Sequence, residues 1–179
     1  MHSIFARINN VSSLLSTCMM VLLAAVAVSS LFLTTDPKGK VDIVSLKVYN
    51  AKAKRYPFKE QEFGFLKFDI DVDLQPLFNW NTKQLFIYLE AEYSSAQGKT
   101  NNTIVLWDRI VRRKEDAHIV VSSGRNKYKF KELSESFKNA SPAEFSLKYN
   151  VMPYVGLLTY GEAARTEAHE IPEARDAIA

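Results

Sequence analysis

Apolar and polar positions divide the chain into two parts with different periods. Between Arg7 and Asp36 lie 28 residues without a charge, and residues 11–33 are almost wholly apolar. At ~1.5 Å per helical residue this 23-residue stretch reaches ~34 Å, enough to cross a bilayer core of ~30 Å. The pattern therefore predicts a short N-terminal segment (1–10) followed by a transmembrane helix over residues 11–33.

Beyond residue 38 the apolar period falls to two, as in half-buried strands. Residues 68–74, FDIDVDL, alternate apolar side chains with aspartates, and residues 85–93 continue the pattern. Further expected strands are 41–49, 103–111, 117–122, 126–131, 144–152 and 154–160. Roughly eight short strands separated by turn signals predict an all-β domain over residues 34–160, folded as an antiparallel β-sandwich.

Two segments of the chain do not show this alternation. Residues 132–139, ELSESFKN, are expected to form a helical turn or an exposed loop. Residues 161–179 are rich in alanine and charge and show no apolar stripe directed at a core. They are predicted to form a charged C-terminal tail, or a short helix that breaks at Pro172.

The apolar segment has two interpretations. A cleaved signal peptide is supported by its short strongest core, residues 19–28, and by Ala25-Val26-Ala27, which resembles a small-residue cleavage site. An anchor is supported by residues 31–33, Leu-Phe-Leu, which extend the apolar run past that site. The pattern favours the anchor and leaves the signal peptide open.

Charge alone leaves the orientation of such an anchor undecided. Only Arg7 precedes the apolar segment, whereas six basic residues follow it closely: Lys38, Lys40, Lys47, Lys52, Lys54 and Arg55. The positive-inside rule would then place the bulk of the chain in the cytosol, although large domains translocate largely regardless of charge. Two N-glycosylation patterns, at Asn101 and at Asn139, favour the lumen instead. Pro142 follows the second pattern, which weakens it.

Composition excludes several classes of function. Of the 23 basic residues all but Arg7 follow the apolar segment, interspersed with all 20 acidic residues, so no nucleic-acid-binding patch is expected. Cys18 is the only cysteine and lies inside the apolar segment. The β-domain therefore has no internal disulfide, cysteine-based zinc site or thiol nucleophile.

Catalytic and cofactor motifs are also missing. Asp69, Asp71 and Asp73 alternate, but an EF-hand would need glycine at Leu74 and glutamate at Trp80. His118 is the one histidine placed to act from a strand, and no GxSxG elbow accompanies any serine. We predict no catalytic, cofactor-binding or metal site, and no cofactor.

The segment LFNWNTKQLFIYLEAEY, residues 77–93, concentrates large side chains. Asparagines on both sides of Trp80 suit a turn, and the next strand places Phe86 and Tyr88 opposite its apolar face. Bulky groups on both faces mean that both faces are covered. Packing within the chain is the interpretation favoured by residue types; the other is contact with a partner through Trp80, Phe86 and Tyr88.

Together with GFLKFDIDVDL, TIVLWDRIV and YNVMPYVGLLTY, this segment resembles subunit 3 of the eukaryotic signal peptidase complex. The likeness runs from the N-terminus to about residue 160 and includes the short N-terminal tail before one apolar segment. It implies a single-pass protein of the endoplasmic reticulum membrane, with a cytosolic N-terminus, a signal-anchor helix and a luminal β-domain.

The same resemblance implies a non-catalytic accessory role in signal-peptide removal. The implied partners are the catalytic signal peptidase subunit, the other small membrane subunits and the membrane itself. Family members commonly carry a luminal glycan before the last strands, which makes Asn139 the first candidate and Asn101 the second. The rival interpretation is a secreted or membrane-anchored β-sandwich that binds an unrelated ligand.

Overall fold

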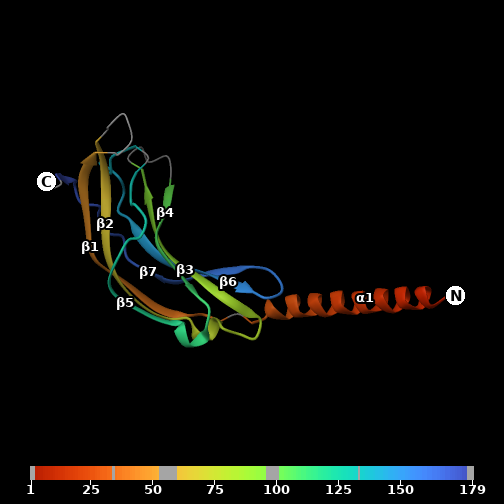
Figure 1. The fold of residues 1–179 in the computed structure, drawn as a ribbon. Helices are drawn as coiled ribbons and strands as arrows, with labels where there is room; N and C mark the ends of the chain where they lie inside the picture. Colours follow the sequence, from red (N-terminus) through yellow and green to blue (C-terminus); the bar gives the residue numbers. More distant parts are fainter. Residues whose placement is uncertain (1–2, 34, 53–59, 96–100, 133, 177–179) are drawn as a thin grey trace.

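The computed structural model describes residues 3–33, 35–52, 60–95, 101–132 and 134–176 (Figure 1). A single helix, α1 (Ile4–Ser30), precedes the strands of a β-sandwich. The strands are β1 (Lys38–Lys52), β2 (Glu60–Asp73), β3 (Thr82–Ser94), β4 (Asn101–Val111), β5 (His118–Arg125), β6 (Glu144–Pro153), β7 (Thr159–Arg165) and β8 (Arg175–Asp176). Two 3₁₀ turns, η1 (Gln75–Leu77) and η2 (Lys114–Asp116), link strands.

Helix α1 is long and apolar enough to cross a membrane, and none of its residues is buried in the protein. Its N-terminus is capped by Ser3, whose side chain accepts a hydrogen bond from the Ala6 amide at 3.3 Å. The hydroxyls of Thr17, Ser29 and Ser30 donate to carbonyls three or four residues earlier, at 2.8–2.9 Å. These hydroxyls are thereby satisfied inside the helix, as an apolar surrounding requires.

The strands form two four-stranded sheets. Sheet A has the order β5-β2-β1-β8, and sheet B has the order β4-β3-β6-β7. Every pairing is antiparallel except that of the two-residue strand β8 with β1. The predicted fold class is confirmed: an N-terminal apolar helix followed by a mainly antiparallel β-sandwich.

The core lies between the inner faces of the two sheets. Period-two alternation places Phe68, Ile70 and Val72 of β2 inward, where each is at most 1% exposed. The predicted inner face of β3 is also confirmed, since its alternate residues from Leu85 to Tyr93 are all buried. One face of each sheet is thus assigned to the core, and the other faces outward.

The prediction of a strand over residues 126–131 is wrong. Only Phe130 forms a bridge, an isolated one to Gly64. The amides of Lys127 and Tyr128 both donate to the Leu106 carbonyl of sheet B, at 2.8 and 3.1 Å. Because the Asn126 side chain accepts from Leu66 of sheet A, this segment crosses from one sheet to the other and cannot form a ladder with either.

The last strands also differ from prediction. Residues 154–158 form a loop, and β7 begins at Thr159 and continues to Arg165, so the boundary expected at residue 160 falls inside a strand. No helix forms in the described part of the tail. Instead, apolar side chains of this segment pack against the core: Ala163, Ala164, Ile171 and Ala174.

The expected loop over 132–139 is present among the described residues. Two of its side chains are buried in the sandwich. Phe137 is 5% exposed and packs edge-on against Phe130 with ring centroids 4.9 Å apart. Glu132 is buried beside them and accepts hydrogen bonds from the Tyr93 phenol and the Asn102 amide. The loop therefore closes one end of the sandwich instead of lying free on its surface.

Candidate interaction surfaces

Side chains that could carry chemistry are dispersed. Within the described ranges, no three His, Cys, Asp or Glu side chains gather to hold a metal ion. His118 Nε2 lies 3.0 Å from Asp71 Oδ1, and both groups are exposed. Asp69 accepts from the Ser123 amide, and Asp73 accepts from the Gln75 amide. The His118 ring thus bonds to a carboxylate on the neighbouring strand of sheet A and not to a serine.

The outer face of sheet B has an apolar half near α1. Register places Ile110 of β4, Phe86 of β3, Asn150 of β6 and Tyr160 of β7 in one row across the sheet. Ile110 is 47% exposed and Tyr160 is 80% exposed. Directly paired residues of antiparallel strands share a face, so these four side chains form one continuous surface.

Two of the predicted contact residues meet on this surface. The rings of Phe86 and Tyr88 stack with centroids 5.5 Å apart and planes inclined by 27°. Both are half-buried, and burial, followed by the nearby Glu90 carboxylate, raises the pKa of the Tyr88 phenol. The described residues form only two sheets, and sheet A covers the other face of β3. The outward-facing side chains Phe86 and Tyr88 are therefore only partly covered by the described part of the chain.

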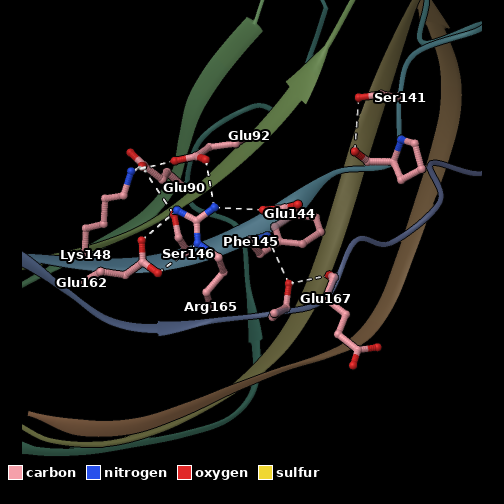
Figure 2. A network of polar contacts seen from close by, with 12 residues as sticks. Glu90, Glu92, Ser141, Glu144, Phe145, Ser146, Lys148, Glu162, Arg165 and Glu167 are labelled. Carbon is pink, nitrogen blue, oxygen red and sulfur yellow. Dashed lines mark hydrogen bonds and ion pairs between the residues drawn. The ribbon is translucent and has the colours of Figure 1, made fainter.

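Further from α1 the same face carries a charged network (Figure 2). Its members are Glu90 and Glu92 on β3, Glu144 and Lys148 on β6, and Glu162 and Arg165 on β7. Lys148 contacts Glu90 and lies 2.7 Å from Glu92. Arg165 Nη1 lies 3.1 Å from Glu92 and 2.9 Å from Glu144, and its Nη2 lies 2.8 Å from Glu162.

The two cations set the protonation of this network. The hydrogen bond from Lys148 holds the pKa of Glu92 below its ordinary value, and the bond from Arg165 does the same for Glu162. Burial acts to lower the pKa of Lys148, but hydrogen bonds to Glu90 and Glu92 outweigh it and raise the pKa. These ion pairs tie β3, β6 and β7 together through their side chains.

Trp80, the third predicted contact residue, lies apart from the Phe86–Tyr88 stack. It occupies the predicted turn between η1 and β3, and its side chain is 63% exposed. Asn79 accepts from the Asn81 amide at 2.8 Å, the local side-chain bond expected of a turn. Asn79 and Asn81 line a cavity together with Ser30 and Leu31, so the turn lies beside the C-terminal end of α1.

Sequence reasoning missed a basic aromatic groove on sheet A. Its walls include three basic and three aromatic side chains from β1, β2, β5 and the segment after β5: Lys47, Lys67, Arg125, Tyr49, Phe65 and Tyr128. Tyr49 and Phe65 pack edge-on at 5.7 Å, and Phe65 is 55% exposed. The outward positions of the alternating strands were a usable signal, but the pairings of β1 with β2 and of β2 with β5 are what bring these side chains together.

The glycosylation candidates lie on the surface. Asn101 is the exposed first residue of β4, and its Oδ1 accepts from Ser94 Oγ at 2.8 Å. Asn139 is exposed in a turn with φ of 63°, a conformation that asparagine tolerates better than most residues. Modification of either residue stays a prediction.

The fold and its surfaces define a class of protein: a β-sandwich carried on a helix able to span a membrane, with exposed apolar and charged faces. Comparison with known proteins assigns the family. The family described as "Signal peptidase subunit" matches residues 1–174. The chain therefore belongs to the signal peptidase subunit family, and the match extends beyond residue 160, where the expected resemblance ended.

Individual relatives agree with this assignment. Signal peptidase complex subunit 3 of Saccharomyces cerevisiae is 36% identical over 171 residues, 90% of this chain and 92% of the relative. The protein of the same name from Caenorhabditis elegans is 34% identical over 158 residues, 88% of this chain and 87% of the relative. The human protein of that name is 29% identical over 158 residues, with the same coverage. The chain is thus a signal peptidase complex subunit.

Proposed function

We propose that this chain is a non-catalytic accessory subunit that supports and positions the catalytic subunit during removal of signal peptides from nascent secretory proteins. Family membership over residues 1–174 is the observation that carries this proposal. The partners of the chain are the catalytic subunit and the other small membrane subunits.

We further propose a type II topology in the endoplasmic reticulum membrane. Residues 1–10 are cytosolic, residues 11–33 form the anchor, and the sandwich from residue 34 on lies in the lumen. Exposed Asn101 and Asn139 support this orientation, because N-glycosylation requires a luminal acceptor. Retention of the anchor is supported by contact between α1 and the folded domain, where a Cβ on Gly156 would stand 3.3 Å from Ala27.

The contact surface for the catalytic subunit is proposed to be the apolar half of the outer face of sheet B. Phe86, Tyr88 and Ile110 provide half-buried or exposed large side chains on a rigid strand framework. Aromatic residues are enriched where proteins bind each other. The charged network on the same face would border this apolar patch on the side further from α1.

Such a surface can be essential without touching the reaction. Misplacement of reacting groups by ~1 Å can reduce a rate by ~100-fold, so a rigid brace for the catalytic subunit contributes through geometry. Anchoring the partners in one membrane also raises their effective concentration, which favours assembly. Both effects require a stiff support, and the two packed sheets supply it.

The test combines Phe86→Ala with Tyr88→Ala and measures how much catalytic subunit co-purifies with the tagged chain. We expect a loss of about tenfold or more, because truncating one hot-spot ring costs ~2 kcal/mol or more. The control combines Phe65→Ala with Tyr128→Ala in the groove of sheet A, where both rings are about half exposed and more exposed than Phe86 and Tyr88. Trp107 fluorescence verifies folding of every variant.

Normal co-purification by the sheet B variant, with a loss in the sheet A control, would move the contact to the groove. Association with an unrelated ligand, and none with signal peptidase subunits, would favour the rival sandwich module. Peptide-bond cleavage by the purified chain alone would contradict the non-catalytic role.

A further inference from the structure

The loop between β6 and β7, residues 154–158, lies against the last turns of α1. A Cβ on Gly156 would stand 3.3 Å from the Ala27 Cα and Cβ and 3.5 Å from Ser30 Oγ. Leu157 lines the same cavity as Ser30 and Leu31. Figure 1 shows this loop, drawn in blue, extending from the sandwich alongside the end of the helix.

The contact with Ala27 gives the depth that the loop reaches. Ala27 lies three residues before the end of α1, and the apolar run continues past the helix to Leu33. With a rise of ~1.5 Å per residue, the loop tip lies ~5 Å below the helix end. Interfacial elements bury their apolar faces ~5–10 Å into the boundary between headgroups and acyl chains. The loop reaches this zone when α1 spans the bilayer.

The side chains around the helix end suit that zone. Four of them are half-exposed or more on the loop and its flanks: Tyr154 (68%), Leu157 (71%), Leu158 (50%) and Tyr160 (80%). Trp80 on the neighbouring turn is 63% exposed. No charged residue occurs from Tyr149 to Gly161 or from Leu74 to Thr82. Tyr and Trp concentrate at membrane interfaces, where an apolar ring and a polar edge are both accommodated.

The backbone of the loop is prepared for a medium poor in water. Asn81 is 3% exposed, and its side chain donates to the Val155 carbonyl at 2.7 Å and accepts from the Val155 amide at 3.1 Å. Its carbonyl accepts from the Tyr154 amide at 2.8 Å. Unpaired backbone groups are costly at membrane depth. By bonding to the backbone groups of Tyr154 and Val155, the buried Asn81 removes this cost for two residues of the loop. Asn81 also joins the loop to the Trp80 turn.

We infer that the β6–β7 loop and the Trp80 turn insert into the membrane interface beside α1, with a lipid surface as their binding partner. Leu157 and Leu158 reach the acyl boundary, while Trp80, Tyr154 and Tyr160 lie at headgroup level. The insertion fixes the height and tilt of the sandwich, which a single helix would leave free. This inference rests on the proposed retention of α1 in the bilayer, and it assigns Trp80 to lipid instead of the catalytic subunit.

The test uses the full chain in phosphatidylcholine nanodiscs. In a Cys18→Ser background, one cysteine at a time is introduced and labelled with an environment-sensitive nitrobenzoxadiazole dye. Leu157→Cys and Tyr154→Cys probe the loop, Met20→Cys reports the span, and Val120→Cys on β5 is the aqueous control. Met20 and Val120 are both exposed in the protein itself, at 70% and 60%.

Labels at positions 157 and 154 are expected to show blue-shifted emission and to lose intensity with lipids that carry a shallow nitroxide. The label at Met20, ten residues before the end of α1, is expected to lose intensity with lipids that carry a nitroxide deep on the acyl chain. The label at Val120 should stay unquenched. Quenching at Met20 without quenching at either loop position would overturn the insertion and leave the anchor intact. Absence of quenching at Met20 as well would overturn both the insertion and the retained anchor. Because no other subunit is present, the result is independent of the proposed contact with the protease.

Discussion

Tyr93 and Glu132 show how single residues secure the end of the sandwich. The carboxylate of Glu132 is buried and accepts a hydrogen bond from the Tyr93 phenol. Asn102 Nδ2 also donates to it, at 3.2 Å to one carboxylate oxygen and 3.3 Å to the other. Burial, followed by the hydrogen bond to Glu132, raises the pKa of Tyr93, so the phenol remains a donor. A buried carboxylate is tolerated when hydrogen bonds replace its water shell.

Tyr93→Phe should lower the free energy of unfolding by about 1–3 kcal/mol, because the buried Glu132 carboxylate loses the phenol as a hydrogen-bond donor. Thermal unfolding of the detergent-solubilised chain, followed by Trp107 fluorescence, measures the loss. The matched control is Tyr128→Phe, which removes an exposed phenol bonded to Asp108 at 2.9 Å and should change stability far less. Equal effects of the two substitutions would contradict a special role for the buried pair.

At the scale of elements, side-chain pairs join strands that the backbone ladder already connects. Arg165 reaches Glu92 on β3 and Glu144 on β6 from the edge strand β7. The pairs are partly exposed, with about a third of the Arg165 side chain in solvent, so each contributes modestly. Their combined effect is to hold β7 in register against its neighbours.

Arg165→Gln tests this network through pH. The carboxyl groups of Glu92 and Glu162 have pKa values below 4.5 in the folded protein, so the stabilisation is present above pH 4.5 and is lost as pH falls through the lowered values. At pH 7 the variant should lose about 1 kcal/mol, and the difference should vanish in acid.

The comparison consists of unfolding midpoints at pH 7 and at pH 2 for wild type and variant. Lys40→Gln, which breaks the more exposed pair with Asp42 on β1, provides the control and should change little at either pH. A loss in Arg165→Gln that is the same at both pH values would show that the residue acts through packing instead of charge.

Gly156 tests the docking of the β6–β7 loop on α1. Its φ of 115° disfavours any side chain, and a Cβ would approach the Ala27 backbone. Gly156→Ala is expected to lower stability by about 1–2 kcal/mol through backbone strain, with crowding against Ala27 in addition. A double-mutant cycle with Ala27→Gly measures the crowding by thermal unfolding. Strict additivity of the two substitutions would contradict close packing between loop and helix.

At the scale of the whole molecule, the helix and the sandwich form a connected unit. Only seven residues separate Ser30 from the start of β1 at Lys38, and Thr35 Oγ1 in this link donates to the Pro76 carbonyl at 3.2 Å. The β6–β7 loop also lies against the helix, at Ala27. If α1 spans the membrane as proposed, these contacts hold the sandwich at a defined height above it, as the proposed positioning role requires.

Orientation is the whole-molecule property that glycosylation can test. If the sandwich is luminal, expression in a eukaryotic secretory system should give a glycosylated band that endoglycosidase H removes. Asn139→Gln and Asn101→Gln, made singly and together, identify the acceptor. Asn10→Gln is the control, since Asn10-Val11-Ser12 is a third acceptor pattern and Asn10 lies in the predicted cytosolic segment. A glycan lost only in the control would contradict the proposed topology.

The sequence by itself determined much of the fold. The charge-free run after Arg7 predicts the helix, because only length and apolarity matter for a span. Alternation over residues 68–74 and 85–93 predicts the inner faces of β2 and β3, since side-chain direction in a strand depends on local geometry alone. The resemblance of these same segments to subunit 3 of the signal peptidase complex gave the family before any fold was known.

Only the tertiary structure decided where distant segments meet. Asn81 forms a hydrogen bond with the loop after β6, 74 residues away in the sequence. Strand β7 begins only after this loop, at Thr159. The segment at residues 126–131 reads as a strand but bonds to both sheets at once. Trp80 and Phe86 are six residues apart, yet one lies beside the helix end and the other on the outer face of sheet B. Local patterns fix the direction of each side chain, whereas its neighbours depend on strand order and register, and no short stretch of sequence contains these.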